Sequence, residues 1–208
     1  MKSKKTILFD FDGTIADSLH RLLEISNSFA EQYGYRKVNM EDIPYYRTKS
    51  TLETFRELKV PLLKVPMIAK KVKRAFQEEA HLSRPYAGMV PVLPALQYDY
   101  SLGILTSNTE KNVRKFLQHH GLCYFDFIYT SSNLFGKSRI LGRILRENSL
   151  RLEETIYVGD EMRDIEAARQ LNMEMVAVSW GAHSAETLAR LRPTHLIHQP
   201  EELLTVIS

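Results

Sequence analysis

The stretch Ile7-Leu8-Phe9-Asp10-Phe11-Asp12-Gly13-Thr14 joins an apolar run to two aspartates that stand one residue apart. The apolar part is typical of a short strand that is buried on both faces. A buried carboxylate is unfavourable unless it is paired, hydrogen-bonded or bound to a metal, and a second carboxylate nearby adds like-charge repulsion. The stretch therefore predicts a site for a hard metal ion at the carboxyl end of a strand, with one carboxylate free to attack an electrophile.

The composition is that of an ordinary globular protein: 208 residues, 44% hydrophobic and 25% charged. The net charge of +3 is too small to indicate nucleic acid, and no apolar run approaches the roughly 18 residues of a membrane span. Cys123 is the only cysteine, which excludes an intrachain disulfide, and its apolar neighbours place it in the core. We expect a cytoplasmic protein without nucleic-acid or membrane partners, as a monomer or homodimer.

Strand-like and helix-like segments alternate in the second half of the chain. After the first strand, at 5–9, strands are expected at 102–106, 125–129, 155–158, 175–178 and 194–197, and helices at 110–120, 138–148, 163–171 and 200–207. Repeated strand–helix units with short connections predict an α/β fold, a parallel sheet covered by helices on both faces.

Residues 17–84 have a different character, because they read as helices throughout and contain no convincing strand. A turn-rich connector at 83–88 ends this part. The chain is therefore expected to divide into a core of residues 1–16 plus 85–208 and a helical cap domain of residues 17–84. An insert that enters directly after the first strand can act as a lid over a site at the end of that strand.

Polar side chains follow three of the predicted strands. Asp10 ends the first strand, Thr106-Ser107-Asn108 the second, and Gly159-Asp160 a later one. In parallel α/β sheets, ligands bind outside the carboxyl ends of the strands. These groups are therefore expected to surround one pocket.

The two aspartates of the opening stretch suit nucleophilic and acid–base catalysis. Asp10 can attack phosphorus and form an aspartyl-phosphate. Asp12 can protonate the leaving oxygen and then activate water. Gly13 permits the tight turn that brings the loop onto a substrate, and Thr14 can close that turn by a hydrogen bond. An isolated Asp-x-Asp is more often a surface loop, but the apolar run before it and Gly-Thr after it favour the catalytic interpretation.

Candidate phosphate-binding groups come from two other segments. The hydroxyl of Thr106 and the main-chain donors of Ser107 and Asn108 can hold phosphoryl oxygens. The same residues can also cap the next helix, and the two roles are compatible. Lys137, before a predicted helix, can offset the carboxylates and bind phosphate. A single lysine is a weak signal that is often surface decoration, and Lys111 is the second choice.

The segment Gly159-Asp160-Glu161-Met162-Arg163-Asp164 is a second acidic cluster. Hard oxygen ligands with few protein carboxylates suit Mg²⁺. The expected ligands are the carboxylates of Asp10 and Asp160 and the main-chain carbonyl of Asp12, with Asp164 ligating directly or through water. Helix capping is the alternative, and it fits Glu161 best.

In these motifs, the chain resembles the haloacid dehalogenase superfamily, in its phosphatase branch with a helical cap after the first motif. Asp10 to Thr14 look like its first motif, Thr106 like the second, Lys137 like the third, and Gly159-Asp160 through Asp164 like the fourth. The lysine is commonly followed by proline in close relatives, whereas Ser138 follows it here. The resemblance implies a Rossmann-like core, Mg²⁺, an aspartyl-phosphate intermediate and a mobile cap. The second aspartate is absent from true dehalogenases, so Asp12 argues against carbon–halogen chemistry.

The favoured function is a Mg²⁺-dependent phosphomonoester hydrolase that acts on a small phosphorylated metabolite, similar to phosphoglycolate phosphatases. A phosphomutase similar to β-phosphoglucomutase, which shares this cap type, is one alternative. A binding or regulatory protein that kept the fold without turnover is another, although Asp10, Asp12, Lys137 and Asp160 are all present. Arg47, Lys49 and Arg56 could meet a substrate anion, but a solvated surface is the better interpretation for each.

Overall fold

A six-stranded parallel sheet forms the centre of the protein. The computed structural model describes residues 4–79, 82–130 and 136–207. The strand order is β5-β4-β1-β6-β7-β8. The strands are β1 (Thr6–Phe9), β4 (Ser101–Thr106), β5 (Phe127–Thr130), β6 (Thr155–Gly159), β7 (Glu174–Val178) and β8 (His195–Ile197). All neighbouring pairs are parallel, with Ile7 of β1 opposite Leu102 and Ile156, so the predicted α/β class is confirmed.

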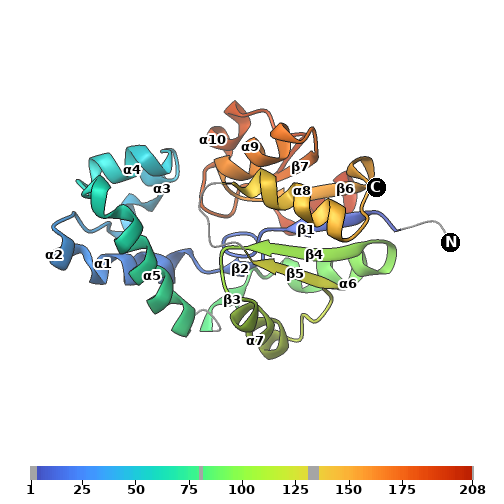
Figure 1. Cartoon of the computed structure of the whole chain (residues 1–208), viewed down its shortest axis with the longest axis horizontal. Helices are drawn as coiled ribbons and strands as arrows, with labels where there is room; N and C mark the ends of the chain where they lie inside the picture. The colour runs from blue at the N-terminus through green and yellow to red at the C-terminus, as the bar shows by residue number, and fades with distance from the viewer. Residues whose placement is uncertain (1–3, 80–81, 131–135, 208) are drawn as a thin grey trace.

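The apolar run of β1 is buried on both faces because helices cover both sides of the sheet. Ile7 and Phe9 pack into one core cluster, which draws on α6, α7 and α11, whereas Leu8 packs into the other, which draws on α8, α9 and α10. Figure 1 shows α7 on one side of the sheet and α8 to α10 on the other. These helices are α6 (Met89–Asp99), α7 (Glu110–His120), α8 (Lys137–Glu147), α9 (Met162–Gln170), α10 (Ala185–Arg190) and α11 (Leu203–Val206).

The helices between β2 (Ala16–Asp17) and β3 (Arg84–Pro85), called the helical insert below, lie beyond the carboxyl ends of the strands (Figure 1). The insert is joined to the rest by a two-stranded antiparallel sheet of β2 and β3. Its helices are α1 (Leu19–Ser28), α2 (Ala30–Tyr33), α3 (Ile43–Tyr46), α4 (Thr51–Glu57) and α5 (Val65–Glu79). The insert thus lies at the edge of the sheet where the polar residues follow the strands.

Several local features differ from the sequence interpretation. Helices α6 and α10 and the short strands β2 and β3 were not expected. Cys123 is exposed, so its predicted place in the core is wrong. It follows the buried Leu122 in the connection between α7 and β5, where the chain returns to the surface. Among the described residues, no helix has the length and apolar character needed to cross a membrane.

Candidate active site

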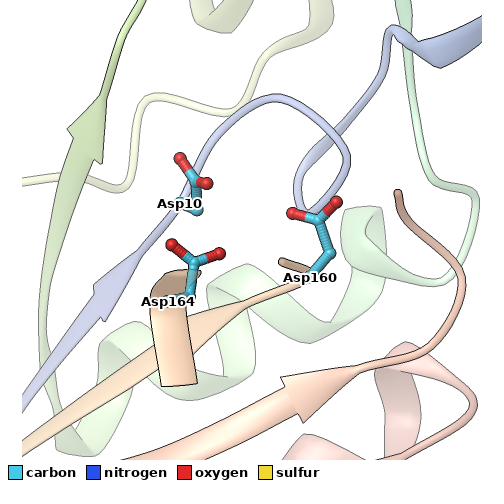
Figure 2. Close-up of side chains that lie close together, drawn as sticks. All are labelled: Asp10, Asp160 and Asp164. Atoms are coloured by element: carbon cyan, nitrogen blue, oxygen red, sulfur yellow. The ribbon is translucent and has the colours of Figure 1, made fainter. Parts of the chain in front are cut away.

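Three buried aspartates converge at the carboxyl edge of the sheet. Asp10 follows β1, Asp160 follows β6, and Asp164 lies in the first turn of α9 (Figure 2). Each offers a carboxylate oxygen, and these three oxygens lie within 4.8 Å of one another. The exposed fraction is 5% for Asp10 and 0% for Asp160 and Asp164. Carboxylates this close and this dry repel one another unless a cation lies among them.

Lys137 supplies one positive charge to this cluster. It is the first residue of α8, and its Nζ donates to Asp10 Oδ2 at 2.6 Å and to Asp164 Oδ1. Burial opposes its charged form, but the two carboxylates outweigh burial and hold the pKa of Lys137 above its ordinary value. The competing candidate, Lys111, is exposed on α7. The structure thus brings Lys137, and not Lys111, to the aspartates.

Asp160 is fixed by the segment around Gly13 and by the loop between β7 and α10. Thr14 Oγ1 donates to Asp160 Oδ1 at 2.9 Å, and the Ala182 amide donates to Oδ2 at 2.7 Å. Gly13 has φ +83°, and a Cβ there would lie 2.2 Å from Asp160 Oδ2. A Cβ at Gly181 would lie 2.3 Å from the same atom. Both glycines are therefore needed for the close approach of backbone to this carboxylate.

Asp164 is held from within its own helix turn and from β6. The Glu161 amide donates to Asp164 Oδ2 at 3.0 Å, which forms a capping box at the start of α9. The Tyr157 hydroxyl donates to Asp164 Oδ1 at 3.1 Å. Glu161 itself pairs with Arg163 at 2.5 Å. The predicted capping role of Glu161 thus coexists with the convergence of Asp164 on Asp10.

Asp12 has a different environment from Asp10. Its Oδ1 is buried without a hydrogen-bond partner among the described residues. Burial raises the pKa of Asp12 to about 6, and the nearby Ser18 and Asn108 side chains oppose that rise. For Asp10, burial raises the pKa to about 7 against the pull of Lys137. Both carboxyl groups can therefore exchange a proton near neutral pH.

Thr106, Ser107 and Asn108 form the turn after β4, on the strand beside β1. Thr106 is buried, and its Oγ1 accepts a hydrogen bond from the Asn108 amide at 2.9 Å. The Asn108 side chain is also buried, and its Nδ2 has no partner among the described residues. Ser107 is half-buried between them. The turn thus offers donors beside Asp12, as expected for anion binding.

The donor set fits a divalent cation. Asp10, Asp160 and Asp164 bring three carboxylates, and Lys137 brings one positive charge. Two negative charges are left without compensation in a buried cluster, which a divalent ion would neutralise. Hard oxygen ligands favour an ion of the Mg²⁺ or Ca²⁺ class.

The three basic residues of the insert considered above as anion contacts differ in their surroundings. Arg47 is half-buried, and its guanidinium donates to the Ser179 carbonyl at 2.5 Å and to the His183 carbonyl at 3.3 Å. Its interpretation as solvated surface is therefore wrong. Lys49 pairs with Glu57 at 3.2 Å, and Arg56 is exposed. The sequence reveals the charge of Arg47 but not the distant loop that it contacts.

Buried aspartates and a lysine at the carboxyl ends of the strands of a parallel α/β sheet are typical of a hydrolase that uses carboxylates and a metal ion. Residues 7–178 match the family model of the haloacid dehalogenase-like hydrolases. The chain belongs to this family. Its predicted place in the phosphatase branch is confirmed by the relatives described next.

Curated relatives match along nearly the whole chain. A phosphoglycolate phosphatase of Synechococcus elongatus is 31% identical over 206 residues, covering 98% of this chain and 97% of that protein. The pyrophosphatase PpaX of Listeria monocytogenes serotype 4b is 28% identical over 214 residues, covering 97% and 95%. A haloacid dehalogenase-like hydrolase from Streptococcus pneumoniae has the same fold, with a TM-score of 0.82, 21% identity and full coverage of both chains.

Proposed function

We propose that the protein is a Mg²⁺-dependent phosphomonoester hydrolase that acts on a small phosphorylated metabolite through an aspartyl-phosphate on Asp10. The observation that carries the proposal is the buried Asp10 at the end of β1, bonded to Lys137 and beside Asp160 and Asp164. The relatives named for phosphoglycolate and pyrophosphate hydrolysis support the same class of substrate. A cytoplasmic location and a monomer or homodimer stay predictions from the sequence.

In the first step, a carboxylate oxygen of Asp10 attacks phosphorus and the bond to the ester oxygen breaks. Asp12 gives its proton to that leaving oxygen, which its pKa of about 6 permits. Asp12, now a carboxylate, then takes a proton from water, and the resulting hydroxide attacks phosphorus. The bond from phosphorus to Asp10 breaks, which releases inorganic phosphate and restores both aspartates.

The other groups stabilise charge. Thr106, the main chain at Ser107 and the side-chain amide of Asn108 hold the phosphoryl oxygens, together with the approach allowed by Gly13. The Asn108 backbone amide, which the sequence suggested for this role, donates to Thr106 Oγ1 instead. The carboxylates of Asp10, Asp160 and Asp164 and the main-chain carbonyl of Asp12 would hold Mg²⁺, with Asp164 direct or through water. When bound, the ion neutralises negative charge on the phosphoryl group. Lys137 lowers the pKa of Asp10 against the effect of burial and adds a further positive charge.

The helical insert serves as a cap in this proposal, a domain of residues 17–84 above a core of residues 1–16 plus 85–208. Two contacts support it. Arg47 reaches the loop after β7, and the Gln77 carbonyl of α5 accepts a hydrogen bond from Asn112 of α7. A cap seated in this way excludes water from the site while phosphorus is attacked.

The test is phosphate release from phosphoglycolate, pyrophosphate, sugar phosphates and nitrophenyl phosphate, with and without Mg²⁺. We expect release that needs the metal and disappears in Asp10→Asn, because an amide cannot form the acyl-phosphate. Asp126→Asn is the matched control, since Asp126 is exposed and its side chain accepts a hydrogen bond from Ser101, away from the aspartate cluster. Normal release by Asp10→Asn would overturn the role of Asp10. Interconversion of esters that requires a bisphosphate, without free phosphate, would indicate a mutase.

A further inference from the structure

Asn112 of α7 joins the helical insert to the turn that follows β4. Asn112 is largely buried, with 9% exposed. Its Nδ2 donates to the carbonyl of Gln77, on α5, at 2.5 Å. The same Nδ2 donates to Asn108 Oδ1 at 3.3 Å. One side-chain amide thus contacts both the helical insert and the turn after β4.

Two backbone groups fix which way both amides face. The Thr109 amide can only donate, and it lies 2.8 Å from the Asn108 side chain, so the atom that receives it is Oδ1. The Gln77 carbonyl can only accept, so the Asn112 atom beside it is Nδ2. With both ends set, only one arrangement of the two amides satisfies all three contacts. It leaves the Nδ2 of Asn108 as the free donor.

That free donor is buried beside the reacting groups. The Asn108 side chain is 4% exposed, and neither its Nδ2 nor Asp12 Oδ1 has a hydrogen-bond partner among the described residues. A buried N–H without a partner is unfavourable, so a structure retains one mainly where a ligand completes it. The position is the turn after Thr106, next to the strand that carries Asp10. An anion bound at this turn would accept a hydrogen bond from Asn108 Nδ2.

We propose that Asn112 is a positioning residue: by bonding both Gln77 and Asn108, it holds the Asn108 amide with Nδ2 toward Asp12 and the transferring phosphoryl group. The proposal rests on the proposed function, because it needs a phosphoryl group at this turn. It also links the orientation of Asn108 to the position of the helical insert, because one of the two hydrogen bonds of Asn112 Nδ2 goes to the Gln77 carbonyl of α5. The helical insert and the turn after Thr106 are then linked through the side-chain amide of Asn112.

The test is a double-mutant cycle on kcat/KM. Asn112→Ala removes the bond to Asn108 Oδ1 and leaves the Thr109 amide as the partner of that oxygen, so the Asn108 amide is held less firmly. We expect a loss on the order of tenfold, as for one hydrogen bond to a charged group. Asn108→Ala removes the donor and should lose at least as much. If Asn112 acts through Asn108, then adding Asn112→Ala to Asn108→Ala has no further effect. If the losses in kcat/KM of the two single variants multiply in the double variant, the proposal is overturned.

Two further variants separate positioning from a structural role. Asn148→Ala is the matched control, because its Nδ2 also bonds one carbonyl, of Ile144, and one side-chain oxygen, of Tyr129, at the far end of α8. It should keep kcat/KM. Asn112→Asp keeps the side-chain volume but cannot donate to either oxygen, so it should lose activity like Asn112→Ala. Activity of Asn112→Asp near that of the wild type would overturn the proposal, even if Asn112→Ala fails to fold.

The affinity for inorganic phosphate, measured by calorimetry with Mg²⁺ present, makes the test independent of turnover. A wild-type protein that binds phosphate but releases none from any ester would contradict the proposed function alone. In that case, the same pattern across the single and double variants in phosphate affinity would still support the role of Asn112. Equal phosphate affinity in Asn112→Ala and the wild type would overturn it.

Discussion

Asp12 and Asp10 stand two residues apart but meet different neighbours. Lys137 bonds Asp10, whereas the carboxylate of Asp12 faces the Ser18 and Asn108 side chains. A lysine partner favours the ionised form that a nucleophile needs. In the metal-free protein burial raises the pKa of Asp10 to about 7 and that of Asp12 to about 6, so the pKa values do not by themselves divide the roles. At the scale of single residues, the proposed division rests on contacts, because Lys137, Asp160 and Asp164 surround Asp10.

This division gives a prediction for Asp12→Asn. The amide cannot protonate the leaving oxygen, so poor leaving groups such as alkyl alcohols should suffer most. We expect their kcat to fall about 10²- to 10⁴-fold, and the formation of the aspartyl-phosphate from nitrophenyl phosphate to fall less. Burst kinetics with both kinds of ester would measure this. Equal slowing of the first step for both esters would count against the acid role.

Among the elements, the loop between β7 and α10 connects the insert to the acidic cluster. Arg47 donates to Ser179 and His183, and the Ser184 amide donates to the Arg47 carbonyl at 2.9 Å. The same loop places the Ala182 amide on Asp160. A guanidinium hydrogen bond of this kind contributes roughly 1.5–3 kcal/mol. Arg47 therefore holds the insert against the loop that positions a candidate metal ligand.

For Arg47→Ala we expect the insert to open about tenfold more often, because the loop contacts of the guanidinium are lost. Amide exchange in α3 and α4 should rise, and KM should rise more than kcat falls. Arg56→Ala is the control, since Arg56 is an exposed arginine on the neighbouring α4. Unchanged exchange and an unchanged KM in Arg47→Ala would show that this contact does not hold the insert.

The elements also show where sequence reasoning succeeds and where it stops. The sheet was predictable because its strands are apolar runs of a recognisable length. Helix α6 was not, because it contains Pro94, which removes a backbone donor. Its four buried side chains, Met89, Val92, Leu93 and Leu96, outweigh that loss by packing on the sheet. Tertiary packing of this kind cannot be read from local preference.

The same limit applies to the candidate site. Asp10, Thr106 and Asp160 could be brought together in advance, because parallel strands end at one edge. Tyr157, Gly181 and Asn112 could not, because their importance lies in contacts with particular atoms of Asp164, Asp160 and Asn108. A close fit to one glycine or one amide leaves no periodic signal in the chain. Such residues can be recognised only in the folded structure.

For the molecule as a whole, charge is distributed unevenly between the surface and the carboxyl edge of the sheet. The chain has a net charge of +3, yet the buried cluster beside the insert carries more carboxylates than cations. Without a metal, protons must supply part of the compensation, and burial raises the pKa of Asp10 from 3.8 to about 7. A metal ion and protons therefore compete for the same carboxylates.

This competition predicts how stability depends on pH. Between about pH 4 and 7, Asp10 holds more protons in the folded protein without metal than in the unfolded chain. The free energy of unfolding therefore decreases as pH rises through this range. Mg²⁺ binds the deprotonated cluster, so the rise in Tm on adding Mg²⁺ should be small at pH 5.5 and several degrees at pH 8. Calorimetry with and without a chelator at both values measures this. Asp160→Asn should remove most of the Mg²⁺ effect, whereas Asp126→Asn should keep it. A rise in Tm that is equal at both pH values, or that survives Asp160→Asn, would mean that the ion binds elsewhere on the protein.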